Sequence, residues 1–529
     1  MKIKKLIMLM LMMGISLSLS AQDASFYKKY ADKGDKEAMC NLADCYGNGS
    51  GGVPQDMTQA VYWLSKAAKK NYAPAQVKLA YCYLYGAGVL IDYKQAWDLA
   101  VKAAKQSDPE ANYLISLMYK EGIYVPQNWS KWLQYIKIAS NLGSPAAQAS
   151  LGIAYLYGVK EAGIAQDPYS AISWLRKAAD QNDDDGAFYL GVCYEYGIGV
   201  AKDEEKALKC YYKAANAGSA QGQYEVAMAY IMGKNGLEVD IAQAKKYLDA
   251  AIAQEEPKAY KLQGDLYYYG IGVDEDNNKA FEWYSKAADA GNIDAATSLA
   301  EMYIHGIGVP KNENKAFQLY KKAADADDMN GLGGLGFCYE NGVGVSKSLS
   351  SAVSYYKRAA EKGHDYSAYR LYLLYREGKG VVNKDINNAI QYLRQAADNG
   401  YNDAIYRLGL EYWTGEILHE EPTTALMYMS QAAENGMNFA AGVLGTIYYA
   451  GYGTVEKDYN RAFEYLSQAV RSPEDFGDNL LSEIYRDLAA CYRFGRGTEV
   501  NHSLASYYTE QAAKYGDEGS VSAVKDLMR

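Results

Sequence analysis

Residues Gly186–Gly218 read GAFYLGVCYEYGIGVAKDEEKALKCYYKAANAG, and this stretch decides the fold because its pattern recurs along the chain. Its first half carries Leu190, Gly191 and Tyr194 ahead of a Gly-x-Gly turn, and its second half carries a Lys-Ala-Ala triplet. The pattern returns thirteen times between residues 36 and 513. A fixed period of about 20–50 residues is typical of solenoids and other repeat arrays, so the repeat predicts the architecture.

A tyrosine followed three residues later by a glycine marks the first half of every repeat. We call these residues the marker tyrosines: Tyr46, Tyr83, Tyr119, Tyr155, Tyr194, Tyr230, Tyr267, Tyr303, Tyr339, Tyr375, Tyr412, Tyr448 and Tyr492. Most repeats are 36 or 37 residues apart. Two are longer, and we interpret the extra residues, around 161–166 and 472–479, as loop insertions.

Each half of a repeat has the spacing of a short helix. In Ala147-x3-Leu151-Gly152-x2-Tyr155, small and apolar residues fall on one face at a period of 3.6 residues. Ala280-x2-Trp283-x3-Ala287 has a similar spacing in the second half. The glycine after each marker tyrosine stands where a helix favours a left-handed C-cap. The chain is therefore predicted to be all-α, with about 26 paired antiparallel helices stacked into a right-handed superhelix. The aromatic side chain of one helix would lie over the small residues of its neighbour.

These residues resemble the Sel1-like repeats, relatives of the tetratricopeptide repeat. The family pattern, roughly A-x3-L-G-x2-Y-x2-G-x-G-V-x2-D-x3-A-x2-[WY]-x2-K-A-A, closely matches residues 186–215, 259–288 and 295–324. The turns at 122–125, 233–239 and 415–420 depart from it, and Gln263 stands at a leucine position. The resemblance implies an α-solenoid of about 13 helix-turn-helix repeats that holds partner proteins or complexes together, in several members at a bacterial envelope.

The N-terminus has the layout of a cleaved secretory signal. Lysines precede an apolar run of about 15 residues, which is short for a membrane span, and the small residues Ser20 and Ala21 follow. The absence of a cysteine there argues against a lipid anchor; an uncleaved anchor is the alternative. We expect a signal peptide over residues 1–21, a capping helix within 22–35, thirteen repeats over 36–513 and a C-terminal capping helix within 514–529. The mature protein is then periplasmic or secreted, without stable membrane insertion.

Charge and cysteine placement restrict the partners and the covalent structure. The formal net charge of −10 repels phosphate backbones, so nucleic acid is not an expected partner. Five of the seven cysteines directly precede a marker tyrosine, and equivalent positions in successive repeats are too far apart to pair. We expect buried free thiols, with a bond between Cys193 and Cys210 as the open alternative.

Several motifs match patterns of catalytic or cofactor-binding sites, but each is explained by its place in the repeats or at a helix start. Gly331–Gly336 matches a dinucleotide-binding fingerprint but falls inside a repeat with no strand before it. Ser354 and Lys357 have the Ser-x-x-Lys spacing of β-lactam-recognising enzymes, without that site's other elements. The acidic runs 183–185 and 274–276 lack the remainder of a calcium loop and are expected to begin helices. We therefore expect no catalytic residues, no cofactor and no metal site.

Variable aromatic residues near the end of the first helix are the candidate partner-binding residues, because aromatic rings with a polar tip suit recognition surfaces. They are Tyr85, Tyr157, Tyr196, Tyr268, Tyr269, Trp413 and Tyr449. The leading hypothesis is a non-catalytic exported scaffold that mediates protein–protein interactions at the bacterial envelope. Two alternatives stay open: a protein that binds glycan or peptidoglycan through an aromatic ladder, and a β-lactamase-like hydrolase.

Overall fold

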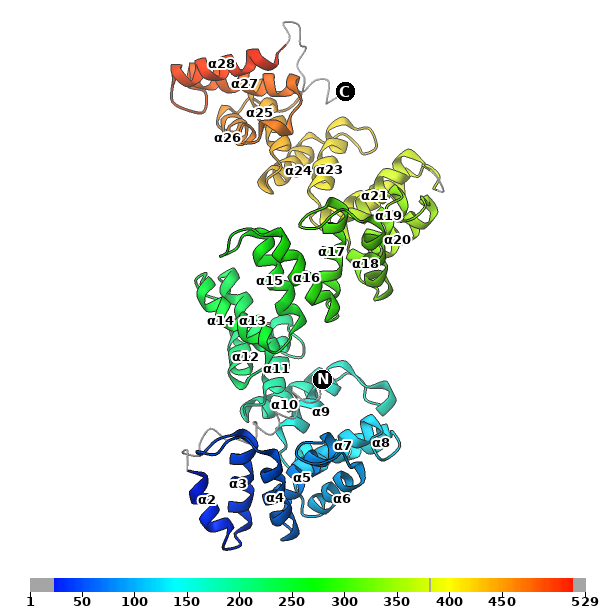
Figure 1. Ribbon diagram of the computed structural model, residues 1–529. Helices are drawn as coiled ribbons and strands as arrows, with labels where there is room; N and C mark the ends of the chain where they lie inside the picture. Colours follow the sequence, from blue (N-terminus) through cyan, green and yellow to red (C-terminus); the bar gives the residue numbers. More distant parts are fainter. Residues whose placement is uncertain (1–22, 380–381, 517–529) are drawn as a thin grey trace. The chain divides into compact units, whose positions relative to one another are not determined.

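The computed structural model describes residues 23–379 and 382–516, and within these ranges the protein is all-α. Twenty-seven α-helices follow one another along the described chain, and the one β-type pairing there is an isolated bridge between Val159 and Ile164 (Figure 1). The predicted all-α solenoid of thirteen helix pairs is confirmed. The predicted signal peptide lies outside the described residues, as does most of the predicted C-terminal helix.

The chain divides into two compact units, of which the first ends at Ala259 and the second begins at Tyr260. The division falls inside α15 (Pro257–Tyr269). In the first unit the N-terminal helix α2 (Ala24–Ala31) packs on α3. Its residues fall within the range 22–35, where a capping helix is expected. The first helices of the repeats there are α3 (Lys36–Asn48), α5 (Ala73–Tyr85), α7 (Pro109–Glu121), α9 (Pro145–Tyr157), α11 (Asp184–Tyr196) and α13 (Ala220–Met232). The second helices are α4 (Met57–Lys69), α6 (Tyr93–Ala104), α8 (Trp129–Asn141), α10 (Pro168–Asp180), α12 (Glu204–Ala217) and α14 (Ile241–Ala253).

The second unit continues the same alternation. Its further first helices are α17 (Ile293–His305), α19 (Met329–Asn341), α21 (Asp365–Glu377), α23 (Asn402–Thr414), α25 (Asn438–Ala450) and α27 (Asp478–Phe494). Its second helices are α16 (Asn277–Asp289), α18 (Glu313–Asp325), α20 (Leu349–Glu361), α22 (Ile386–Asp398), α24 (Pro422–Glu434), α26 (Tyr459–Ala469) and α28 (His502–Tyr515). Within each unit the first helix of a repeat packs against its own second helix, and that second helix packs against the first helix of the next repeat.

One backbone hydrogen bond closes every helix pair. The residue that caps the second helix donates its N–H to the carbonyl oxygen of the marker tyrosine, from Asp56 to Tyr46 at 2.8 Å through to Asn501 and Tyr492 at 2.9 Å. The glycine three residues after each marker tyrosine has positive φ, and in most repeats, as in Gly197 at φ 68° and ψ 32°, it forms the predicted left-handed cap. Gly158 and Gly451 have positive φ but extended ψ values of 153° and 108°, so the predicted cap is wrong in these two repeats. These positions need glycine because other residues rarely adopt that conformation. The turn is thus fixed by local chemistry in each repeat.

Close approach of the paired helices depends on small residues in the first helix. A Cβ on Gly191 would lie 2.7 Å from a ring carbon of Tyr211, and one on Gly336 would lie 2.5 Å from Tyr356. An aromatic ring therefore lies over small residues, as predicted, but one position later than expected. Tyr284 is 3% exposed, whereas Trp283 is only half-buried. Tyr284 follows Ala280 by four residues, which continues the buried stripe of the helix.

The two insertions predicted as loops, around residues 161–166 and 472–479, differ in structure. The first forms a short 3₁₀ turn, η1 (Lys160–Ala162), between α9 and α10, as a loop insertion should. The second begins with the 3₁₀ turn η2 (Pro473–Asp475), but its end lengthens α27 to 17 residues. The prediction that residues 472–479 are all loop is therefore wrong at the C-terminal end. Leu480 and Leu481 are buried, and this burial stabilises the additional turn of helix.

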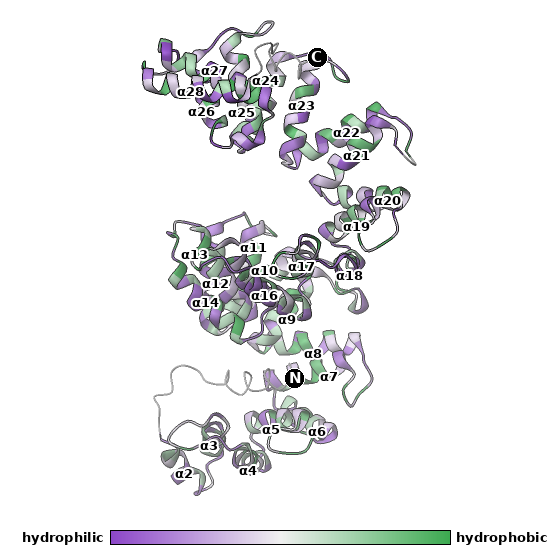
Figure 2. Cartoon of the chain, turned by 45° about the horizontal axis from the view of Figure 1, so that its top comes forward, coloured by the Kyte–Doolittle hydropathy of each residue, from purple (hydrophilic) through white to green (hydrophobic). Residues whose placement is uncertain are grey.

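Hydrophobic and hydrophilic residues alternate around the helices instead of forming apolar segments (Figure 2). Each helix buries one stripe and leaves the rest to solvent. Of the helices described, none combines the length and the apolar character that crossing a membrane requires.

Candidate functional site

The seven candidate aromatic residues fall into two groups. Tyr157, Tyr196 and Tyr269 are exposed at 58%, 70% and 67%. Each is the last residue of its helix, directly before the capping glycine. Tyr85 occupies the same position on α5, but it is half-buried and stacks on Tyr81 with ring centroids 6.2 Å apart. Tyr157 and Tyr196 sit in repeats four and five of the first unit, and Tyr269 sits in repeat seven in the second unit.

The remaining candidates make contacts within the chain. Tyr268 packs edge-to-face on Tyr269 with ring centroids 4.9 Å apart, and Trp413 packs against the core of the second unit. The hydroxyl of Tyr449 accepts a hydrogen bond from Nη1 of Arg496 at 2.6 Å, and the same guanidinium lies over the Tyr449 ring. The rings of Tyr268, Trp413 and Tyr449 therefore take part in packing within the chain.

Seven of the thirteen marker tyrosines stack one ring face on a tyrosine of the second helix in their own repeat. Tyr339 stacks on Tyr355 of the second helix at 5.6 Å, while Phe317 of the preceding repeat meets Tyr339 edge-to-face at 5.8 Å. Tyr492 repeats the stacking, with Tyr508 at 5.8 Å. The predicted packing role of the marker tyrosines is visible in these contacts.

Buried tyrosine hydroxyls of the second helices pair with carboxylates of the first helices. Tyr284 donates to Oδ1 of Asp265 at 2.8 Å, and Tyr356 donates to Oε2 of Glu340 at 2.7 Å. Arg370 of the next repeat donates its Nε to the same Glu340 oxygen at 3.2 Å. A partner for each buried hydroxyl removes the cost of burying it alone.

Two residues of repeats ten and eleven break the repeat pattern at buried positions. The residue before the marker tyrosine is Cys, Met, Leu, Ile or Ala in every repeat except the eleventh, where it is Glu411. Three residues before the marker tyrosine stands Gly, Ala or Ser in every repeat except the tenth, where it is Tyr372. Sequence reasoning missed both residues. A comparison of the repeats column by column would have found them.

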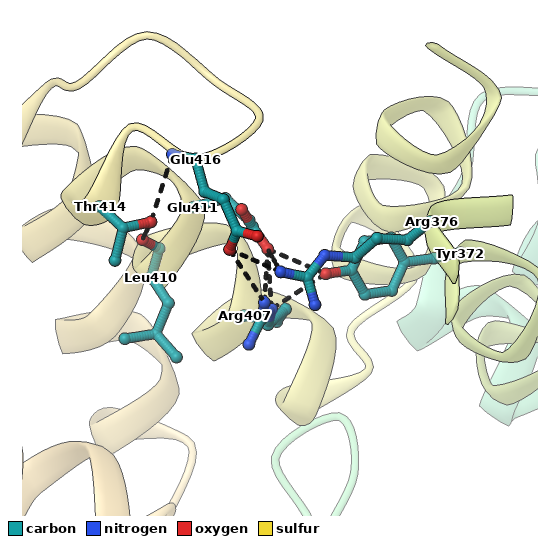
Figure 3. A network of polar contacts seen from close by, with 7 residues as sticks. All are labelled: Tyr372, Arg376, Arg407, Leu410, Glu411, Thr414 and Glu416. Carbon is teal, nitrogen blue, oxygen red and sulfur yellow. Dashed lines mark hydrogen bonds and ion pairs between the residues drawn. The ribbon is translucent and has the colours of Figure 1, made fainter. Parts of the chain in front are cut away.

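The two exceptions lie in contact (Figure 3). Tyr372, fully buried on α21, donates its hydroxyl to Oε1 of Glu411 at 3.0 Å. Nε of Arg407 lies 2.9 Å from the Tyr372 hydroxyl and 2.9 Å from Oε1 of Glu411. Nη2 of Arg376 lies 2.6 Å from Oε2 of Glu416 and 3.7 Å from Oε1 of Glu411. We call these five side chains the Glu411 network.

Burial and charge in this network together favour the ionised form of the Arg407 guanidinium. Glu411 is 1% exposed, and its Oε2 has no hydrogen-bond partner among the described residues. Burial alone lowers the pKa of the Arg407 guanidinium, but its interactions with Glu411 and Tyr372 outweigh burial and raise the pKa. Burial raises the pKa of the Tyr372 hydroxyl, which stays protonated and able to donate. A buried carboxylate beside two guanidiniums fixes the orientation of both.

The repeats also identify the family. The sequence profile described as Sel1 repeat matches thirteen segments: residues 36–72, 73–108, 109–144, 145–183, 184–219, 220–255, 259–292, 293–328, 329–364, 366–401, 402–437, 439–472 and 483–517. The chain belongs to the Sel1 repeat family. Proteins built from Sel1 repeats are a kind of repeat scaffold for protein–protein interaction, because stacked helix pairs present an extended surface.

Relatives match parts of this Sel1 repeat chain. Chitin synthase regulatory factor 3 of Schizosaccharomyces pombe is 32% identical over 130 residues, which cover 24% of this chain and 14% of that protein. DAP3-binding cell death enhancer 1 of Mus musculus is 30% identical over 175 residues, which cover 33% of this chain and 26% of that protein. The chain thus spans about a seventh to a quarter of the length of these relatives.

A crystal structure covers nearly the whole chain. It is that of a protective antigen present in uropathogenic Escherichia coli strains and displaying an SLR fold. It is 26% identical, covers 94% of this chain and 98% of its own, and superposes with a TM-score of 0.51. The Sel1 repeat architecture therefore extends along the described chain.

Within the Sel1 repeats, the chemical motifs have packing or capping roles. Gly331–Gly336 lies inside α19, where Gly334 and Gly336 accommodate the rings of Tyr320 and Tyr356. Asp183 and Asp276 cap α11 and α16 by accepting backbone N–H groups, as predicted for the acidic runs. Among the described residues, no group of three His, Cys, Asp or Glu side chains is placed to hold a metal ion.

The Ser-x-x-Lys pair is unsuited to nucleophilic catalysis. Ser354 is exposed on α20, and Nζ of Lys357 lies 5.5 Å from the ring centroid of Tyr375. A hydrogen bond to Tyr375 raises the pKa of Lys357. An activating lysine needs a lowered pKa, so this pair does not support the hydrolase hypothesis.

The seven cysteines of the Sel1 repeats are free thiols, and all but Cys210 are buried. Cys193 and Cys210 are not bonded to each other. Burial raises the pKa of Cys193 to about 11, so this thiol is protonated at neutral pH and behaves as a small apolar side chain.

Proposed function

We propose that this Sel1 repeat protein is a non-catalytic, exported scaffold that binds partner proteins at a bacterial envelope. The observation that carries the proposal is a set of exposed tyrosines at one register position: Tyr157, Tyr196 and Tyr269, each more than half exposed at the end of a first helix. Exposed aromatic rings are over-represented at the centres of protein interfaces.

The relatives support protein binding in general terms. One is named a chitin synthase regulatory factor and another a DAP3-binding protein, and both names describe action through other proteins. The N-terminal signal-like pattern supports export. The glycan alternative would use the same exposed rings of Tyr157 and Tyr196, so it is separated from protein binding by experiment.

The proposal is tested by site-specific crosslinking in the native cell. A photoreactive residue is placed at Tyr157, Tyr196 or Tyr269, and the matched control is Tyr169, which is 78% exposed on the second helix α10. We expect discrete protein adducts from the first three positions and none from the control. Equal labelling at all four positions would contradict the proposal.

Export and glycan binding have separate measurements. Fractionation should recover the chain from the periplasm or the medium, and a cytoplasmic location would overturn the envelope assignment. Sedimentation with purified peptidoglycan should leave the protein in the supernatant. Pelleting that disappears when Tyr157 and Tyr196 become Ala would replace protein binding by the glycan alternative.

A further inference from the structure

The Glu411 network holds a carboxylate between two guanidiniums at its outer edge. Oε2 of Glu416 lies 2.6 Å from Nη2 of Arg376 and 4.0 Å from Nη2 of Arg407. The two guanidiniums come from α21 and α23 of successive repeats, and they converge on this one carboxylate (Figure 3). Converging guanidiniums are a common way to recognise a carboxylate.

The inner part of the network is fixed and the outer part is open. Glu411 is 1% exposed, and its buried carboxylate contacts the guanidiniums of both Arg407 and Arg376 and so orients them. The side chains of Arg376 and Arg407 are 23% and 27% exposed, whereas that of Glu416 is 60% exposed. An ion pair of a solvent-exposed glutamate is weak, so the Glu416 carboxylate is displaceable while Glu411 is not.

Three departures from the repeat pattern meet at this point. Tyr372 replaces a small residue, Glu411 replaces an apolar one, and residues 415–420 replace the Gly-x-Gly turn. The first two departures occur in no other repeat, whereas the turns at 122–125 and 233–239 also depart from the Gly-x-Gly pattern. Glu416 is supplied by the irregular turn, and its N–H reaches Oγ1 of Thr414 only at 3.4 Å. Ile417 and Leu418 of this turn pack against the core, so the exchange needs only the exposed Glu416 side chain to rotate away.

We propose that Arg376 and Arg407 form a receptor for a carboxylate of an acidic segment of a partner protein, and that Glu416 occupies this receptor in the free chain. Binding exchanges the intramolecular carboxylate for an intermolecular one and leaves the Glu411 contacts in place. A carboxylate is the matching ligand because a carboxylate already fills the position. The inference rests on the proposed protein-binding function and identifies one feature of the partner.

The test measures binding of fluorescein-labelled hexaglutamate to the full chain by anisotropy at fixed salt, with hexaglutamine as the neutral probe. Glu416→Gln removes the internal competitor and should tighten hexaglutamate binding at least fivefold, with hexaglutamine unaffected. The matched control is Glu377→Gln, which changes the net charge equally on α21, where Glu377 pairs with Lys379 instead. Adding Arg376→Gln or Arg376→Lys to Glu416→Gln should remove the gain.

Equal hexaglutamate affinities for the Glu416→Gln and Glu377→Gln variants would overturn the receptor, as would a gain that survives both Arg376 substitutions. The assay contains no cellular partner. Crosslinking at Tyr157 can therefore succeed while this test fails, which would reject the receptor and keep the proposed function.

Discussion

The hydroxyl of Tyr372 donates a hydrogen bond to Oε1 of Glu411 at 3.0 Å, although the two residues are 39 positions apart in the chain. The bond joins repeats ten and eleven through two side chains that break the pattern of the other repeats. A buried carboxylate costs stability unless it is paired, so these residues depend on each other and on Arg407.

Removing the buried carboxylate should destabilise this part of the second unit. We expect Glu411→Ala to lower the free energy of local unfolding of α21 and α23 by about 3 kcal/mol, because it removes the carboxylate that accepts from both the Tyr372 hydroxyl and the Arg407 guanidinium and leaves the buried guanidinium charge without its counter-ion. Amide hydrogen exchange of these helices measures the change. The exposed Glu416→Ala is the control, with an expected cost below about 1 kcal/mol. Wild-type protection in Glu411→Ala would show that the network contributes nothing to stability.

Adding one methyl group to a packing glycine should also destabilise the fold. A Cβ on Gly336 would lie 2.5 Å from the Tyr356 ring, so Gly336→Ala should cost about 1–3 kcal/mol. The same substitution in an open helix gains about 1 kcal/mol. The equivalent residue in repeat eight is Ala300, and Ala300→Gly should lose about 1 kcal/mol. Urea unfolding followed by circular dichroism tests both signs, and a stabilising Gly336→Ala would refute the steric account.

The pH dependence of stability should respond to Asp487. Burial raises the pKa of this carboxyl to about 7, whereas the unfolded chain ionises it near its ordinary value of 3.8. The folded state therefore binds more protons between these values, and this residue makes stability fall as pH rises from about 4 to 7. Asp487→Asn should flatten that part of the profile and raise the urea midpoint at pH 8 relative to the wild type. An unchanged slope would contradict the assignment.

A residue with the opposite pKa shift provides a control for this experiment. Hydrogen bonding from the Lys279 N–H lowers the pKa of Asp276, which caps α16. Its contribution is present above its unfolded pKa and is lost as pH falls through the folded value. Asp276→Ala should therefore lower stability at pH 7 more than at pH 3.

A charge in the alanine stripe tests the packing of the helix pairs. Ala287 is fully buried beside Tyr284, and Ala287→Asp should lower the free energy of unfolding by about 3 kcal/mol or more. Urea unfolding compares it with Glu282→Asp, an exposed position on the same helix whose effect should be within about 0.5 kcal/mol. Similar midpoints for the two variants would contradict the packing of α16.

The period, the helices and the turns could be predicted from the sequence because each depends on residues close together in the chain. Gly197, three residues after Tyr194, specifies a left-handed cap by its own conformational freedom. Asp203 caps the next helix through its own side chain. The same local logic placed Trp283 on the buried face, where the structure has Tyr284, because one-residue shifts on a helix depend on what packs against it.

The candidate site could not be predicted in the same way. Spacing identified Tyr157 and Tyr196 as variable aromatic residues, but it could not separate them from Tyr449, whose ring is covered by Arg496. The exposure of a ring depends on side chains from other repeats. Glu411 was missed because motif reading emphasises positions that agree, and its significance lies in disagreeing with the apolar residues at the same position in other repeats.

The sequence by itself determined a stack of thirteen Sel1 repeats, because helix period and turn geometry are local properties. The meeting of five side chains, by contrast, follows from packing between repeats: Tyr372, Arg376, Arg407, Glu411 and Glu416. That contact depends on how α22 packs between the repeats and brings side chains of α21 and α23 within reach, although the residues are more than thirty positions apart.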